Sequence, residues 1–161
     1  AITKAQVFIS DNGANHYGKN GSLRGFKGGV YEGGSRVPAM ISYPNKIKKG
    51  MTNGQTILTM DLLPTLLDFI DEKPSGENID GISIKSNLLN RDDLAERAVF
   101  YAFRNKSFIR SKNWKLIKIK EEHKINFELY DLSSDLSEKN DVSLKNTGLL
   151  NILKEKLLIK R

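Results

Sequence analysis

One stretch of the sequence, VFISDNGANHYGKNGSLRGFKGGVYEGGSRVP from Val7 to Pro38, decides the fold of the first part of the chain. It opens with a short apolar run and breaks off at Asp11-Asn12-Gly13, which is typical of a turn after a buried strand. The stretch contains eight glycines and four lysine or arginine residues. We therefore expect a strand over residues 6–10 that carries an acid and an amide at its end, followed by a cationic, glycine-rich loop.

The sequence beyond this stretch predicts a second strand and a helix. Residues 37–43 form an apolar run, and Pro38 can occupy the first position of a strand without breaking its hydrogen bonds. Residues 61–70 show the apolar i, i+3, i+4 spacing of a helix docked on a core. Asp61 can act as its N-cap, and Pro64 is tolerated in its first turn.

From about residue 97 the pattern changes to short runs with period-2 character, separated by turn signals. A small antiparallel sheet is expected from the runs 98–103, 107–110, 114–120 and 126–130. Residues 149–159 then predict an amphipathic helix, and residues 71–80 a polar loop. The sequence therefore predicts two parts, an α/β piece over residues 1–90 and an antiparallel sheet with a helix over residues 91–161.

The composition is that of a globular protein. Hydrophobic residues make up 39% and charged residues 28% of the chain. No apolar run approaches the roughly 20 residues that span a bilayer. The chain has no cysteine, so it contains no disulfide, thiolate metal site or cysteine nucleophile.

The positive charge is concentrated in the glycine-rich part. The net charge is +7, and residues 1–60 contribute eight basic and two acidic side chains to it. Such a field favours an anionic partner. Nucleic acid is not expected, because no recognition motif is present and few aromatic residues accompany the basic ones.

The end of the first predicted strand suggests a metal site. Ligands in open α/β sheets bind at the carboxyl ends of strands, where Asp11 and Asn12 stand. A carboxylate and an amide carbonyl are hard oxygen donors, suited to Ca²⁺ or Mg²⁺. Two donors are too few for Ca²⁺, which takes about six to eight oxygens. An ordinary Asx turn explains the same three residues equally well.

The glycine loop suggests an anion site. Arg24 and Lys27 stand three residues apart among glycines that allow close approach of the backbone to a ligand. A lysine beside open backbone N–H groups can hold an oxyanion, although a plain surface loop has the same composition. Glu32 is expected to be structural and to pair with a nearby base such as Arg36.

Several general motifs are excluded. A calcium-binding EF-hand loop that starts at Asp11 would have His16 in place of its glycine and Ser22 in place of its final glutamate. No Gly-Lys-Ser/Thr sequence of a phosphate-binding loop and no His-Glu-x-x-His zinc motif is present. No helical pattern directly follows the glycines, as a dinucleotide fingerprint requires.

The order of the segments resembles the downstream half of the sulfatase family, within the alkaline phosphatase superfamily. The resemblance rests on Ser10–Gly13, Leu23–Gly28, Tyr31–Pro38, Asp61–Leu67, Asp80–Ser83, Asn113–Ile117 and Glu128–Leu132. It covers nearly the whole chain. It implies an α/β fold: the C-terminal part of an alkaline-phosphatase-like α/β sandwich, followed by a small antiparallel sheet packed with a C-terminal helix.

The resemblance also implies roles for individual residues. Asp11 and Asn12 match the motif that supplies two ligands to the active-site Ca²⁺. Lys27 matches the catalytic lysine that contacts the substrate sulfate. Arg24 and His16 are candidates for substrate binding, with a plain loop histidine as the alternative for His16.

The sequence departs from the family pattern at two places. The family's nucleophile is a formylglycine made in a Cys/Ser-x-Pro-x-Arg segment, and this sequence contains no such segment. The upstream aspartate pair, which supplies further calcium ligands, is also missing. We therefore expect a fragment of a sulfatase that is inactive alone, binds Ca²⁺ weakly and is prone to self-association. The family implies an exported, for example periplasmic, enzyme whose substrate is a sulfate ester of a sugar or aryl group.

Two other functions remain open. A phosphatase or phosphotransferase relative on the same fold would use a pair of transition metals with several Asp and His ligands. A non-catalytic binding or structural module would account for the missing nucleophile. The Asn12 amide and the Lys27 loop favour the sulfatase arrangement.

Overall fold

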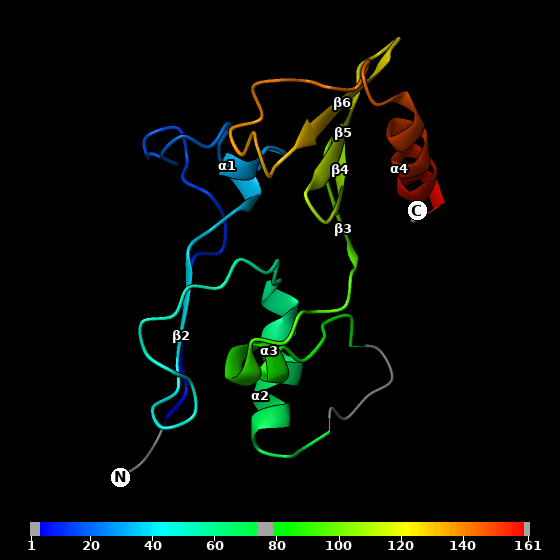
Figure 1. Cartoon of the computed structure of the whole chain (residues 1–161). Coiled ribbons are helices and arrows are strands. Elements are labelled where there is room, and N and C mark those ends of the chain that lie inside the picture. The colour runs from blue at the N-terminus through cyan, green and yellow to red at the C-terminus, as the bar shows by residue number, and fades with distance from the viewer. Residues whose placement is uncertain (1–3, 74–78, 160–161) are drawn as a thin grey trace. The chain divides into compact units, whose positions relative to one another are not determined.

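The computed structural model describes residues 4–73 and 79–159, which form two compact units (Figure 1). The first unit comprises the chain up to Phe8 together with Met40–Ala95. The second comprises Ile9–Ala39 and the chain from Glu96 onward. None of the helices within the described residues is long and apolar enough to cross a membrane.

The first unit contains the two strands and the helix predicted from the first part of the sequence. Strands β1 (Gln6–Ile9) and β2 (Ala39–Ser42) pair in a two-stranded sheet. A 3-10 turn (η1, Thr59–Asp61) leads into α2 (Leu62–Phe69), and a short helix α3 (Lys85–Asn90), which the sequence did not predict, follows. The predicted loop over residues 71–80 lies partly outside the described residues.

Asp61 is the N-cap of α2 by position, but its side chain does not cap the helix. Its carboxylate instead accepts hydrogen bonds from the backbone N–H groups of Leu58 (2.7 Å) and Ile82 (3.1 Å). Nearby, the Thr65 hydroxyl accepts a bond from the N–H of Ile84 (3.0 Å). These side chains therefore fix the segments on either side of α2, because they satisfy backbone donors that are not part of a helix or sheet.

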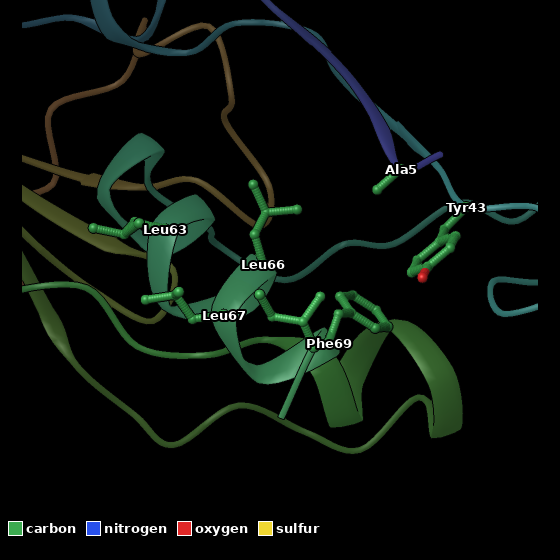
Figure 2. Close-up of a pocket in the computed structure, with 7 residues that line it drawn as sticks. Ala5, Tyr43, Leu63, Leu66, Leu67 and Phe69 are labelled. Atoms are coloured by element: carbon green, nitrogen blue, oxygen red, sulfur yellow. The ribbon is translucent and has the colours of Figure 1, made fainter. Parts of the chain in front are cut away.

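Helix α2 exposes part of the apolar stripe that was predicted to dock on a core. Leu63 and Ile70 are 56% and 64% exposed. The stripe lines an open hollow in this unit (Figure 2), formed by Ala5, Tyr43, Leu63, Leu66, Leu67, Phe69 and Ile70.

The second unit is built on the predicted antiparallel sheet and C-terminal helix. Its strands follow one another in sequence order: β3 (Ala98–Phe103), β4 (Lys106–Ser111), β5 (Trp114–Lys120) and β6 (Ile125–Asp131). Helix α4 (Thr147–Ile159) packs against β4 and β5. The runs and turn signals in the sequence thus located all four strands to within one residue at each end.

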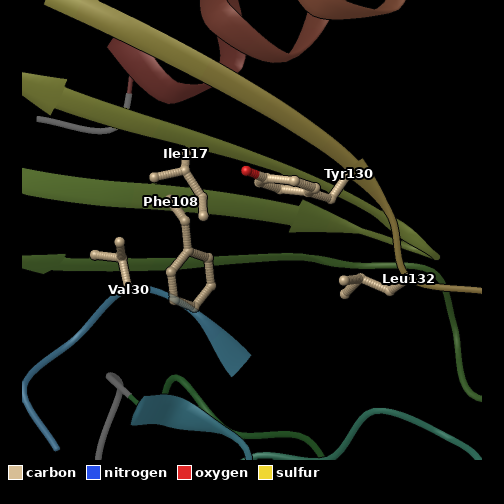
Figure 3. Packing of buried hydrophobic residues seen from close by; sticks show 5 residues of the cluster. All are labelled: Val30, Phe108, Ile117, Tyr130 and Leu132. Atoms are coloured by element: carbon tan, nitrogen blue, oxygen red, sulfur yellow. The ribbon is translucent and has the colours of Figure 1, made fainter. Parts of the chain in front are cut away.

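Both faces of this sheet are covered, so neighbouring residues of β4, β5 and β6 are buried on opposite sides. On one side, Ile109, Leu116 and Leu129 stand side by side in register and pack with Leu153 of α4. On the other, the glycine-rich segment covers the sheet through a second apolar cluster (Figure 3), consisting of Val30, Phe108, Ile117, Tyr130 and Leu132.

The compact units divide the chain differently from the two parts predicted from the sequence. Residues 9–39 belong with the antiparallel sheet, whereas the predicted boundary near residue 90 separated them from it. The division into 1–90 and 91–161 stays a prediction about a longer protein. Within the described residues, the glycine-rich segment packs on the antiparallel sheet.

We expect Leu153→Ala to destabilise the second unit by about 2–5 kcal/mol, because the change leaves a cavity between α4 and the sheet. Leu153 is 2% exposed, whereas Leu158 on the same helix is 51% exposed. The matched variant Leu158→Ala should cost no more than about 1 kcal/mol. Chemical unfolding followed by the fluorescence of Trp114, the single tryptophan, measures both. Equal effects of the two variants would contradict the assigned packing.

Candidate functional site

The stretch that carries the predicted metal ligands follows directly on β1. The Ser10 hydroxyl donates a hydrogen bond to the backbone oxygen of Asn12 (2.8 Å), which tightens the turn around Asp11. Asp11 is exposed and Asn12 is half-buried. No side-chain hydrogen bond to the Asp11 carboxylate or the Asn12 amide occurs among the described residues, so their oxygens are available to a ligand.

Backbone hydrogen bonds join this stretch to residues 23–28, which contain Arg24 and Lys27 and are called the lysine loop. The N–H of Lys27 donates to the carbonyl of Ala14 (2.9 Å), and the N–H of Gly13 donates to the carbonyl of Gly34 (3.1 Å). The predicted metal ligands and the predicted sulfate-binding lysine therefore belong to one hydrogen-bonded framework. The Lys27 side chain is exposed and forms no ion pair with any described residue.

Close contact between backbone segments requires two of the glycines. The N–H of Gly33 donates to the carbonyl of Arg24 at 2.7 Å. A Cβ atom at Gly33 would lie only 2.5 Å from the carbonyl oxygens of Arg24 and Gly25, and one at Gly13 would overlap the carbonyl of Gly33. Such separations are too short for a side chain. These glycines therefore allow the backbone segments around residues 13, 24–25 and 33 to touch.

His16 lies beside the lysine loop. Its exposed ring stands 4.8 Å from the ring of Phe26, centroid to centroid, with the planes tilted by 44°. Phe26 directly precedes Lys27, so the histidine and the lysine come from neighbouring parts of the loop. Substrate binding by His16 stays a prediction.

Arg24 is occupied by partners within the protein. Its Nη1 donates to the Tyr130 hydroxyl (2.9 Å) and to the backbone oxygen of Glu138 (3.0 Å). Its guanidinium also stands 3.7 Å from the centre of the Tyr31 ring, in a cation–π contact. Its predicted role in substrate binding is not tested by these contacts, but they show that the side chain holds the loop to the sheet.

Two tyrosines beside Arg24 also link the glycine-rich segment to the sheet. The hydroxyls of Tyr31 and Tyr130 both donate to Oε2 of Glu128, at 2.8 and 2.9 Å. Burial, together with the hydrogen bond to this carboxylate, raises the pKa of both tyrosines above the usual value. Both hydroxyls therefore stay protonated and remain donors across the physiological range.

A buried ionic cluster lies beneath the framework. The carboxylate of Glu32, in the short helix α1 (Glu32–Ser35), contacts Lys115 (2.8 Å), Arg36 (3.2 Å) and Arg110 (3.6 Å). The predicted pairing of Glu32 with Arg36 is confirmed. Lys115 also lies 2.9 Å from Oε1 of Glu138, and the side chains of both residues are 0% exposed.

The two carboxyl groups of this cluster behave differently. Burial opposes the ionisation of Glu32, but Lys115 and the two arginines outweigh it and lower the pKa. Burial raises the pKa of Glu138, against the opposing influence of Lys115. Glu32 is therefore the firmly ionised partner. Removal of Lys115 would leave Glu32 with the two arginines, whereas Glu138 would lose the cation that lies 2.9 Å from its Oε1.

Sequence reasoning missed Lys115, Arg110 and Glu138. Lys115 is separated from Glu32 by 83 positions, and Glu138 by 106. Lysines that alternate with apolar residues in a strand ordinarily face solvent, so no local signal indicates burial. Only the cover of the sheet by residues 9–39 brings these groups together.

Asp11 and Asn12 fit calcium in kind but not in number. No group of three or more His, Cys, Asp or Glu side chains able to hold a metal occurs in the part of the chain that the structure describes. Two hard oxygen donors suit Ca²⁺, and the rest of its coordination shell would have to come from other residues or water.

The family model that matches the chain covers most of it. It describes the C-terminal region of N-sulphoglucosamine sulphohydrolase and matches residues 26–161. The chain belongs to the sulfatase family. The resemblance identified from the sequence motifs is thereby confirmed.

Curated relatives of this sulfatase chain are considerably longer. A sulfatase of Formosa agariphila is 34% identical over 160 residues, which is 87% of this chain and 29% of the relative. An N-acetylglucosamine-6-O-sulfatase of Bacteroides thetaiotaomicron is 30% identical over 145 residues, 78% of this chain and 25% of the relative. The chain thus spans less than a third of each.

Solved structures show the same fold. The crystal structure of Ps i-CgsB superposes with a TM-score of 0.82 at 26% identity, covering 94% of this chain and 35% of that one. Its complex with k-i-k-neocarrahexaose gives a TM-score of 0.80 at 27% identity, with the same coverage. The α/β fold class with an antiparallel sheet and C-terminal helix is thereby confirmed.

We expect Gly33→Ala to destabilise the second unit by about 1–3 kcal/mol, because the added methyl must push the two carbonyls of the lysine loop away. Gly148, at the start of α4, has no atom within 4 Å of the Cβ position. Gly148→Ala should therefore be neutral or stabilising by up to about 1 kcal/mol. Chemical unfolding followed by Trp114 fluorescence compares the free energies of unfolding of the two variants. A neutral Gly33→Ala would show that α1 and the lysine loop are not held in contact.

Proposed function

We propose that this chain forms one wall of the active site of a sulfatase that hydrolyses sulfate esters. The observation that carries the proposal is the shared framework in which Lys27 bonds to Ala14 while Gly13 bonds to Gly34. This framework presents the side-chain oxygens of Asp11 and Asn12 and the Lys27 ammonium group from the same loop system, and none of these groups has a side-chain partner among residues 4–73 and 79–159. Membership in the sulfatase family supports the assignment.

In this proposal, Asp11 and Asn12 supply two ligands to Ca²⁺ and Lys27 binds the sulfate group. The ammonium of Lys27 would offset negative charge on the sulfuryl oxygens, more strongly in the transition state than in the bound ester. A bound Ca²⁺ would supply further charge neutralisation as a Lewis acid. The formylglycine nucleophile would come from another part of the protein, so the 161-residue chain alone is expected to be inactive.

We further propose that the substrate is a sulfated carbohydrate and the intact enzyme an exported one. The relative from Bacteroides thetaiotaomicron is named an N-acetylglucosamine-6-O-sulfatase, and Ps i-CgsB was crystallised with a neocarrahexaose. The phosphatase alternative is less well supported. Such relatives typically use two transition metals with several Asp and His ligands, whereas the Asn12 amide and the Lys27 loop suit a single Ca²⁺ and a sulfate group.

Lys27→Ala in the intact enzyme should lower kcat/KM by about 100-fold or more, because a preorganised charge at the reacting group is lost. Lys48→Ala removes an exposed lysine from the other unit and should leave kcat/KM unchanged. Initial rates with an aryl sulfate and a panel of sulfated sugars measure both variants. Unchanged turnover in Lys27→Ala would exclude the lysine from the sulfate site.

Asp11→Ala should raise the free Ca²⁺ concentration that gives half-maximal activity by about 10- to 100-fold, because one charged ligand is removed. Glu122→Ala, which removes an exposed acid from the turn between β5 and β6, is the matched control. Activity across buffered Ca²⁺ concentrations and calorimetric titration of the apo-enzyme give two independent readings. If both variants bind Ca²⁺ like the wild type, Asp11 is not a ligand.

A further inference from the structure

Lys115 occupies an unusual place for a lysine in an antiparallel strand. Its side chain is 0% exposed, whereas Lys120 at the end of the same strand is exposed. Its Nζ stands 2.8 Å from Glu32, 2.9 Å from Glu138 and 4.5 Å from the centre of the Phe108 ring. The ammonium is thus buried against two carboxylates and the face of an aromatic ring.

Both carboxylates that meet Lys115 also contact or belong to α1. Oε2 of Glu138 accepts a hydrogen bond from the backbone N–H of Glu32 at 2.6 Å, at the first residue of that helix. Glu138 adopts φ = 53°, a left-handed conformation that is unfavourable for a residue with a side chain. The backbone is therefore held in an unfavourable state where it delivers this carboxylate.

Helix α1 in turn determines where the lysine loop lies. The N–H of Gly33 bonds to the carbonyl of Arg24, and the carbonyl of Gly34 accepts the bond from Gly13. Both glycines belong to α1, so a shift of this helix moves both ends of the framework. The framework includes the bond between Lys27 and Ala14.

We propose that Lys115 is a positioning residue of the sulfatase site, which fixes α1 through Glu32 and Glu138 and thereby holds Lys27 in place. This role rests on the function proposed above for Lys27. Lys115 itself touches no substrate.

The ionic composition of the cluster supports positioning rather than simple stability. Charged groups buried together contribute little net stability compared with apolar side chains of similar size. The apolar cluster around Val30 already attaches the segment to the sheet. The hydrogen bonds from Lys115 to Glu32 and from the Glu32 N–H to Glu138 are directional and restrict the rotation and sliding of α1, and the ion pair between Lys115 and Glu138 adds to them.

The test uses the intact sulfatase with Lys115→Met, which keeps the length of the side chain and removes the charge. We expect kcat/KM to fall by about 10- to 100-fold, as for other misplacements of a catalytic group. Hydrogen exchange should accelerate at the amides of Gly13, Lys27, Gly33 and Gly34, while the amides paired between β4 and β5 keep their protection. Lys120→Met, on the same strand, should change neither quantity.

Lys115→Arg is the conservative variant, because it retains a cation that can reach both carboxylates. It should recover part of the lost kcat/KM and part of the lost protection. If Lys115→Met does not fold, Glu138→Gln tests the same ion pair. The amide oxygen of the glutamine can still accept the hydrogen bond from the N–H of Glu32, but the negative charge that meets Lys115 is gone. The expected pattern is the same, with a smaller change.

Two results would overturn the positioning role. One is wild-type kcat/KM and wild-type exchange in a folded Lys115→Met or, failing that, Glu138→Gln protein. The other is a loss of protection spread evenly over the sheet and the loop, which describes a residue that only stabilises the unit. An intact protein without activity on any sulfate ester would contradict the proposed function instead, and the exchange pattern would still decide whether Lys115 holds the loop.

Discussion

The second unit depends on one buried cation, Lys115, which meets the carboxylates of Glu32 and Glu138 within 3 Å. A charge in an apolar interior is tolerated only when it is paired, because burial removes the water that would otherwise solvate it. The three groups come from β5, from α1 and from the chain beyond β6. Their contacts join segments that are far apart in the sequence and, together with the apolar cluster around Val30, hold the glycine-rich segment on the sheet.

The two faces of the antiparallel sheet serve different purposes. The face toward α4 carries the apolar cluster of Ile109, Leu116, Leu129 and Leu153, and the hydrophobic effect there accounts for much of the stability. The opposite face mixes an apolar cluster with ion pairs and tyrosine hydroxyls. These polar contacts have defined directions, so this face positions the loop it carries as well as holding it.

This arrangement gives a physical role to the small antiparallel sheet that follows the glycine-rich segment. The loop that carries Asp11, Asn12 and Lys27 contains little regular structure of its own, apart from the single turn of α1. Glycines permit its layers to touch, but glycine also gives a free chain many conformations. A rigid sheet beneath the loop selects one of them, as the proposed sulfate site would require.

The sequence by itself determined the secondary structure of the sheet, the helix α4 and the family. The secondary structure depends on periodicity and turn residues that can be read within about ten positions, and the family depends on the order of motifs along the chain. Tertiary structure alone decided that residues 9–39 belong with the sheet and that Lys115 is buried. The reason is that burial of a polar group depends on a partner elsewhere in the chain. The partner of Lys115 lies 83 positions away, and no local pattern encodes that distance.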